Sequence, residues 1–194
     1  MAKKKQSRRK AAKRSDPVGP WAALTAGKKG PAEAINLLIQ DHQEVESLFL
    51  AYERSVDSAE KVRLAERICL DLKAHTWLEE KFFYPAVRKA TGEDELIDHA
   101  LEEHAEAKKL VSQIESALAA DASFDALMVE LREAIDAHVS EEEDELFPAT
   151  RKTDLDLYSL GNSLAVQRLR RVAGLCGKPD LIIPEKIRRQ ATRL

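Results

Sequence analysis

Two stretches of this sequence repeat one arrangement of histidine and glutamate. His75 is followed four positions later by Glu79, and His138 is followed four positions later by Glu142. In both stretches a second glutamate comes next, an aromatic residue stands nine positions after the histidine, and a proline stands ten after it. Residues four apart on an α-helix share a face. Each histidine and its first glutamate can therefore reach a single point, as ligands of one metal site do.

A second pair of histidines extends the repeat. His42 stands 33 positions before His75, and His104 stands 34 positions before His138. Each of these two upstream histidines follows an acidic residue directly. The spacing predicts two helical hairpins, each with one histidine on its first helix and a His-x-x-x-Glu on its second, related by an approximate twofold axis.

The neighbours of the four histidines predict that they face a core. His42, His75 and His104 have apolar residues both three positions before and three positions after them, and His138 follows Ile135 by three positions. A buried carboxylate without a partner costs several kcal/mol, so two inward glutamates in related positions require a cation. Imidazole and carboxylate together suit iron, manganese or zinc, and no cysteine cluster points to a structural zinc site.

Other polar residues near these positions are weaker candidates. His99 is surrounded at helical spacing by glutamates, which is typical of a solvated face. Glu46 has a lysine as its counterpart in the repeat. Whether His99, Glu46 or Glu103 contributes to the site stays open at this point. The second glutamates of the two stretches, Glu80 and Glu143, are candidates to orient the imidazoles.

Hydrophobic periodicity predicts the helices that position these residues. The first begins at Pro31 and ends near residue 56. The second begins at a Ser58 cap, is kinked by Pro85 and stops at Gly92. The third covers about 93–119, and the fourth, capped by Ser123, carries His138 and Leu146. The fold class is therefore all-α, an up-down-up-down four-helix bundle with an extra C-terminal helix near 155–173 and basic tails.

The charge of the chain divides it into three parts. Residues 1–30 carry a net charge of +9, residues 31–150 carry −18, and residues 151–194 carry +6, which together give −3. We interpret 1–30 as a disordered basic arm, 31–150 as the metal-binding bundle, and 151–194 as a helix with a basic tail. The eight Lys/Arg within 3–14 make residues 1–14 a candidate contact for nucleic acid or another polyanion, or a solubilising tail.

Composition excludes several classes of protein. Charged residues make up 34% of the chain and hydrophobic residues 44%, so we expect a folded, helix-rich protein. No run approaches 18 apolar residues, so no membrane span is expected. The N-terminus lacks the apolar segment of a secretory signal, although residues 1–14 share their basic, acid-free character with transit peptides. Two cysteines are too few for a disulfide scaffold, and a cytoplasmic location fits.

The ligand pattern resembles the hemerythrin/HHE cation-binding family. The resemblance rests on His42, His75-x-x-x-Glu79, His104 and His138-x-x-x-Glu142, and it covers residues 31–150. The Asp-Leu-Tyr-x-Leu-Gly stretch at 156–161 is also similar to a segment that follows the domain in bacterial members. The resemblance implies a centre of two non-haem iron ions that binds oxygen or related small molecules. It further implies that the four histidines are terminal ligands and that the two glutamates bridge the irons.

One departure from the family pattern bears on the expected function. Oxygen-carrying hemerythrins have a fifth histidine four positions before the third-helix ligand, where this chain has Ala100. Two octahedral irons would then keep two open positions instead of one. This disfavours reversible oxygen carriage and favours a site that senses or binds oxygen, nitric oxide, peroxide or iron, or alternatively a redox enzyme that consumes peroxide or oxygen. The sequence leaves open whether the protein is an enzyme.

Overall fold

The computed structural model describes residues 33–117 and 122–177, and this part of the chain contains helices and no strand. The predicted basic arm at 1–30 and the end of the basic tail lie outside the described residues. The elements, in chain order, are α2 (Ala34–Arg54), α3 (Ser58–Leu78), the π-helical turn η2 (Glu79–Phe83), α4 (Tyr84–Thr91), α5 (Asp94–Ser116), α6 (Ala122–Glu141), the π-helical turn η3 (Glu142–Leu146), α7 (Phe147–Thr150) and α8 (Leu157–Leu175).

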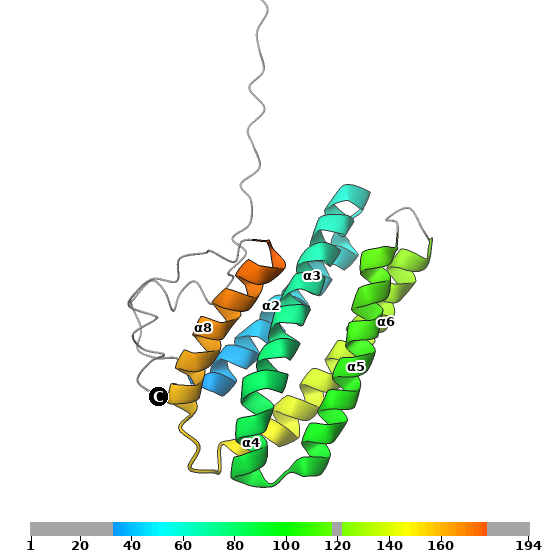
Figure 1. Ribbon diagram of the computed structural model, residues 1–194. Helices are drawn as coiled ribbons and strands as arrows, with labels where there is room; N and C mark the ends of the chain where they lie inside the picture. The colour runs from blue at the N-terminus through cyan, green and yellow to red at the C-terminus, as the bar shows by residue number, and fades with distance from the viewer. Residues whose placement is uncertain (1–32, 118–121, 178–194) are drawn as a thin grey trace, which may run out of the picture.

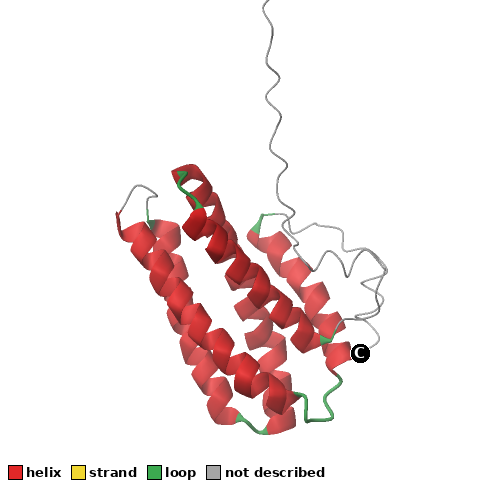
Figure 2. Ribbon diagram, turned by 180° about the vertical axis from the view of Figure 1, so that it is seen from behind, coloured by secondary structure: helices red, strands yellow, loops and turns green. Residues whose placement is uncertain are grey.

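Four long helices form the bundle as two hairpins. α2 and α3 pack along each other, α5 and α6 do the same, and α3 also contacts α5 (Figure 1). α8 lies outside the four, against α2 and α3. The view from behind, coloured by secondary structure, shows helices joined by loops and no strand in the described part of the chain (Figure 2). The prediction of an all-helical bundle with an extra C-terminal helix is confirmed. None of the described helices is both long enough and apolar enough to cross a membrane.

The helix ends agree with the sequence signals to within a few residues. Gly92 ends α4 in the left-handed conformation (φ 76°) that glycine adopts most readily. The predicted cap of the second helix is wrong by one residue, because Asp57, and not Ser58, accepts a hydrogen bond from the backbone N–H of Glu60 at 3.0 Å. The predicted Ser123 cap is also wrong, because Ser123 already lies within α6.

A π-helical turn follows each His-x-x-x-Glu and precedes each proline of the repeat. The N–H of Tyr84 bonds to the carbonyl of Glu79, and the N–H of Phe147 bonds to that of Glu142, both with a spacing of five residues. A π turn leaves one carbonyl without an intrahelical donor, and the following proline has no N–H to give. The kink expected at Pro85 therefore takes the form of a wider turn, which puts the aromatic residue on the same face as the glutamate.

The core consists of two apolar clusters separated by a polar layer. Within α2, Ile35 and Leu38 belong to one cluster and Val45 and Phe49 to the other, with His42 between them. The other three bundle histidines also fall between the two clusters in the order of their own helices. Apolar packing on both sides excludes bulk water from the layer and fixes the rotamers of its side chains.

Candidate metal centre

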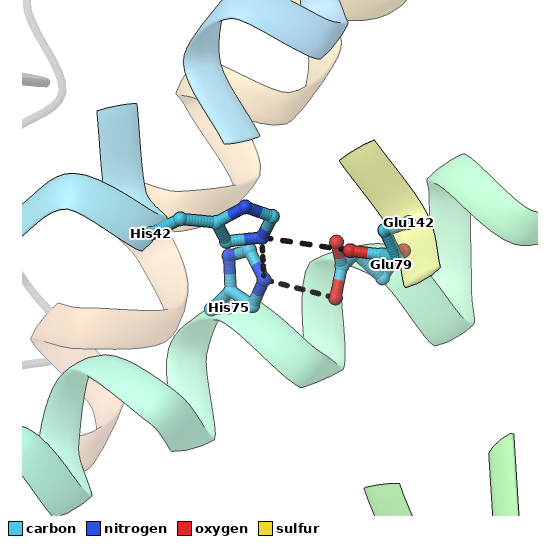
Figure 3. A group of neighbouring side chains, drawn as sticks. All are labelled: His42, His75, Glu79 and Glu142. Atoms are coloured by element: carbon cyan, nitrogen blue, oxygen red, sulfur yellow. Dashed lines mark hydrogen bonds and ion pairs between the residues drawn. The ribbon is translucent and has the colours of Figure 1, made fainter. Parts of the chain in front are cut away.

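The six residues predicted as ligands come together in the polar layer. His42, His75, Glu79 and Glu142 form one group whose potential ligand atoms all lie within 4.8 Å of one another (Figure 3). Glu79 forms a second group with His104 and His138. α2, α3, α5 and α6 each supply one histidine, and η2 and η3 each begin with one of the glutamates. All six are buried, and the exposed fractions of Glu79 and Glu142 are 0% and 1%.

Each of the four imidazoles has a carboxylate behind it. The Nδ1 atoms lie at hydrogen-bonding distance from one oxygen of Glu143 (His42, 2.8 Å), Asp41 (His75, 3.4 Å), Glu80 (His104, 3.1 Å) and Glu103 (His138, 2.9 Å). An ionised carboxylate can only accept, so Nδ1 carries the proton in each ring. In a neutral imidazole, Nε2 then presents a lone pair to the centre of the layer.

These outer carboxylates follow the repeat. Within each hairpin, the acidic residue just before the first histidine, Asp41 or Glu103, accepts from the second histidine. The second glutamates act across the hairpins. Glu80 of the first hairpin faces His104 of the second, and Glu143 of the second hairpin faces His42 of the first. From the sequence, Glu80 and Glu143 were candidates to orient the imidazoles, the role of Glu103 was open, and Asp41 was not predicted. The signal for Asp41 and Glu103 was their position directly before a histidine in the aligned repeat.

The Nε2 atoms meet in two pairs. The Nε2 atoms of His42 and His75 are 3.2 Å apart, and those of His104 and His138 are 3.1 Å apart. Two nitrogens bound to one ion at about 2.1 Å are about 3.0 Å apart in octahedral and about 3.4 Å apart in tetrahedral coordination. Each pair is therefore spaced to share one ion.

Each inner glutamate lies between the two pairs. Oε2 of Glu79 is 3.1 Å from Nε2 of His75 and 3.4 Å from Nε2 of His104. Oε2 of Glu142 is likewise 3.5 Å from Nε2 of His42 and of His138. One carboxylate oxygen thus contacts a histidine of each pair, which is the placement of a group that bridges two ions.

The inner carboxylates suit a cation, because the protein leaves some of their oxygens buried without a hydrogen bond. Both carboxylate oxygens of Glu79 and Oε2 of Glu142 are buried without a hydrogen bond of acceptable geometry. The nearby imidazoles lie at ion-pair distance from them, but the Nδ1 protons of these rings point outward. Buried charge of this kind persists only beside a positive charge, which a metal ion or extra protons on the imidazoles can supply.

The interactions among the protein's own ionisable groups show the same demand for positive charge. Burial alone lowers the pKa of His75, but Glu79 and Asp41 outweigh burial and raise the pKa to about 10. Burial also opposes protonation of His104, whose pKa Glu79 and Glu80 raise to about 9. Burial raises the pKa of Glu79, yet His75 and His104 bring it well below its usual value.

The repeat-related aromatic residues differ in chemistry. The hydroxyl of Tyr84 donates a hydrogen bond to Oε1 of Glu142 at 2.8 Å and lies 3.3 Å from Nε2 of His104. Its counterpart, Phe147, has no hydroxyl and stacks on the His42 ring with centroids 5.9 Å apart. Burial and the Glu142 charge raise the pKa of Tyr84 well above its usual value, so the phenol keeps its proton. The sequence indicated the shared position but not this contact.

The weaker candidates lie outside the buried layer. The side chain of His99 is 55% exposed and pairs with Glu141 at 2.7 Å. Glu46 is exposed and lines a groove of about 420 Å³ together with His42, Arg132 and Glu143. This groove, between α2 and α6, brings solvent to the outer edge of the His42 ring.

Comparison with known proteins places the bundle in a described family. Residues 33–150 match the sequence model of the family described as hemerythrin HHE cation binding domain. A crystal structure of a hemerythrin HHE cation binding domain-containing protein from Mycobacterium kansasii has a similar fold, with a TM-score of 0.67. The similarity covers 82% of this chain and 99% of the other, at 21% sequence identity.

A sequence relative has a different description. A protein of Nostoc sp. described as a DNA nickase is 30% identical to this chain over 131 residues, which are 67% of this chain. The match takes up 37% of the relative. The chain therefore spans little more than a third of the length of this curated relative.

Proposed function

The chain belongs to the hemerythrin HHE cation-binding family, and we propose that its polar layer holds two iron ions for the binding of oxygen, nitric oxide or peroxide. In this proposal the ligands of the ions are His42, His75, His104 and His138, with Glu79 and Glu142 as bridges. His42 and His75 would hold one ion, and His104 and His138 would hold the other. Imidazole and carboxylate suit iron, manganese and zinc alike, and iron is proposed among them because the resemblance in ligand pattern implies it.

One observation carries the proposal above all others. Glu79 has both oxygens buried without a hydrogen bond, and one of them lies between a histidine of each pair. Among the protein groups, only extra protons on the buried imidazoles could compensate this charge. An ion in each histidine pair compensates it, and a bridging carboxylate accounts for its position between the pairs.

Six protein ligands leave coordination positions open on both ions. A bound pair of irons supplies Lewis acidity and electrons for chemistry with a small oxygen- or nitrogen-containing molecule. The protein contributes the surroundings of these positions. Phe83 and Phe147 meet edge to face with centroids 5.6 Å apart on one side of the layer. Both rings belong to the apolar cluster on this side of the layer, where they exclude water.

Tyr84 favours a reactive site over a passive carrier. Its phenol keeps a proton 2.8 Å from Oε1 of Glu142 inside the dry layer. If the layer holds two irons, this hydroxyl would be placed to donate a hydrogen bond or a proton to an oxygen-containing molecule beside them, as a general acid does. Phe147 cannot do this at the related position. The second candidate function, a redox enzyme that consumes peroxide or oxygen, rests on this hydroxyl.

Metal analysis of single variants tests the ligand assignment. Full-length protein is loaded with ferrous iron without oxygen, freed of loose metal and analysed for iron per chain. We expect two ions in the parent chain, one or none in His75→Ala and His138→Ala, and two in the control His99→Ala, which changes an exposed histidine. Equal loss of iron from the His99 variant, or full retention in the other two, contradicts the assignment.

A second proposal concerns the basic arm, which lies outside the described residues. We propose that residues 1–14 contact nucleic acid, because eight Lys/Arg fall within residues 3–14 and the Nostoc relative is described as a DNA nickase. Binding of this kind is salt-dependent and little affected by base sequence. Deletion of 1–30 should abolish DNA binding at low salt and leave the iron content at two. If the full-length chain binds neither DNA nor RNA at low salt, the arm has no such role.

A further inference from the structure

A buried arginine reaches the polar layer from outside the matched domain. Arg168 belongs to α8, beyond residues 33–150, and is only 1% exposed. Its Nε donates to Oδ2 of Asp41 at 3.0 Å, and its Nη2 lies 2.9 Å from Oδ1 of the same carboxylate. This two-pronged contact fixes both the position and the plane of the carboxylate.

The carboxylate of Asp41 also contacts His75, a proposed metal ligand. Oδ2 of Asp41 lies 3.4 Å from Nδ1 of His75. Arg168, Asp41 and His75 therefore form a continuous chain of polar contacts from α8 through α2 to α3. Arg168 also approaches Oδ1 of Asp71 at 3.4 Å, so a second buried acid helps to hold the guanidinium in place.

The second half of the repeat lacks this support. Glu103, the counterpart of Asp41, has a side chain that is 20% exposed, and among the described residues it contacts neither arginine nor lysine. The position that corresponds to Asp71, four before the histidine, is Ala134. α8 packs on α2 and α3 (Figure 1). α8 thus contributes to one half of the layer, whereas in the other half the half-exposed Lys108 pairs with Glu80, the carboxylate behind His104.

We infer that Arg168 is a positioning residue of the metal centre, which holds Asp41 so that His75 presents Nε2 to the ion it shares with His42. The inference rests on the proposed pair of metal ions. Its consequence is that α8 makes the two ions unequal, with the ion at His42 and His75 held on the more rigid support. Outer-sphere partners of this kind change metal affinity by about 10- to 100-fold.

The test first uses two variants, each of which keeps only one complete histidine pair, so that each proposed ion is studied alone. In a His138→Ala background we expect the ion at His42 and His75 to remain, and in a His75→Ala background the ion at His104 and His138. Arg168→Lys is introduced into each, because lysine keeps the charge but cannot make the two-pronged contact. Affinity is measured on the full chain with cobalt(II), a redox-stable probe, against a competing chelator, and the cobalt absorption spectrum is recorded.

The control and a second variant guard against effects on folding. Arg171→Lys makes the same change three residues along α8, where the side chain lies over the Trp77 ring, 5.4 Å from its centroid. Arg168→Gln with Asp71→Asn removes one positive and one negative buried charge together, so that the net charge of the buried groups around Asp41 is unchanged. Far-UV circular dichroism of each metal-free variant checks that the helices remain.

We expect Arg168→Lys and the double variant to lower cobalt affinity at least tenfold, and to shift the spectrum, in the His138→Ala background only. Arg171→Lys should change neither background. An equal loss in both backgrounds would mean a merely structural role, and no loss in either would mean that Asp41 needs no fixing; both results overturn the inference. If neither background binds cobalt, the same change is made in the parent chain, where Arg168→Lys should weaken one of the two binding steps; equal weakening of both steps, or of neither, overturns the inference, whereas a parent chain that binds no cobalt refutes the two-ion proposal itself.

Discussion

The hydroxyl of Tyr84 donates a 2.8 Å hydrogen bond to Oε1 of Glu142, and this contact joins the two halves of the repeat inside the polar layer. Tyr84 follows the His-x-x-x-Glu of the first half, whereas Glu142 belongs to that of the second. The other oxygen of Glu142 stays buried without a hydrogen bond. One carboxylate therefore faces both the phenol proton and the two histidine pairs.

Tyr84→Phe should separate metal binding from reactivity. The change removes only the hydroxyl and copies the residue found at the related position 147. We expect iron to remain at two per chain and the rate of oxidation of the reduced protein by peroxide to fall by about 100-fold, the lower end of a general-acid contribution. Stopped-flow absorbance follows the rate. Tyr158→Phe, at a side chain on the surface, is the control, and an unchanged rate in Tyr84→Phe refutes the proton role.

Glu79→Gln should impair both ions, since the Glu79 carboxylate contacts one histidine of each pair. The amide keeps the size of the side chain but loses the negative charge that bridging ions require. We expect fewer than two ions per chain by metal analysis after the same loading. Glu141→Gln, a partly buried neighbour of Glu142 that pairs with His99, should keep both ions. Two tightly held ions in Glu79→Gln would remove Glu79 from the ligand set.

The metal-free protein should lose stability as the pH rises above neutral. In the folded chain the pKa values of His75 and His104 are about 10 and about 9, above the ordinary value of 6.5. Their contribution is fully present below pH 6.5 and is lost as the pH rises through 9 and 10. Glu79, whose pKa is lowered, acts in the opposite direction and loses its contribution as the pH falls below 4.5.

Urea unfolding of metal-free protein at a series of pH values checks this dependence. We expect the urea concentration at the unfolding midpoint to decrease as the pH rises from 6.5 to 10. The decrease should be smaller in His75→Gln. Because the two imidazoles hold extra protons at pH 7, metal loading should also release protons into a weakly buffered solution. A midpoint that is flat or rises over this range contradicts the proposed charge balance of the layer.

Much of the candidate site could be predicted from the sequence because the histidine and glutamate pattern occurs in both halves of the repeat. The spacing of His75 to Glu79 and of His138 to Glu142 fixed a helical face, and the earlier histidines followed from the repeat. The resemblance in ligand pattern named the family, which the match over residues 33–150 confirms. Helix bounds followed from hydrophobic periodicity, with errors of a few residues where serine or aspartate can each serve as a cap.

The rest depends on contacts that no local pattern encodes. Arg168 has no counterpart in the repeat, and an arginine in a helix of mixed character gives no sign that it will be buried beside Asp41. The π-helical turns depend on how the chain accommodates Pro85 and Pro148 within packed helices, and periodicity assumes a constant α-helical spacing. The contact of Tyr84 with Glu142 follows from those turns.

Ile68→Ala should weaken the fold without touching the ligands. Ile68 is fully buried in the apolar cluster on the far side of the layer from Tyr84, about two turns along α3 from His75. Truncation of such a side chain costs about 2–5 kcal/mol of unfolding free energy. We expect that loss in urea unfolding with two ions retained under native conditions. Loss of an ion would show that packing at this distance controls the layer.

The central claim is a pair of iron ions bridged within one layer. Its most direct test is Mössbauer and magnetic measurement, with metal analysis, on full-length protein loaded with iron-57 and then oxidised. The account predicts two irons per chain that are antiferromagnetically coupled, so that the oxidised centre is diamagnetic at low temperature. One iron per chain, or two irons with independent paramagnetic signals, would contradict the account.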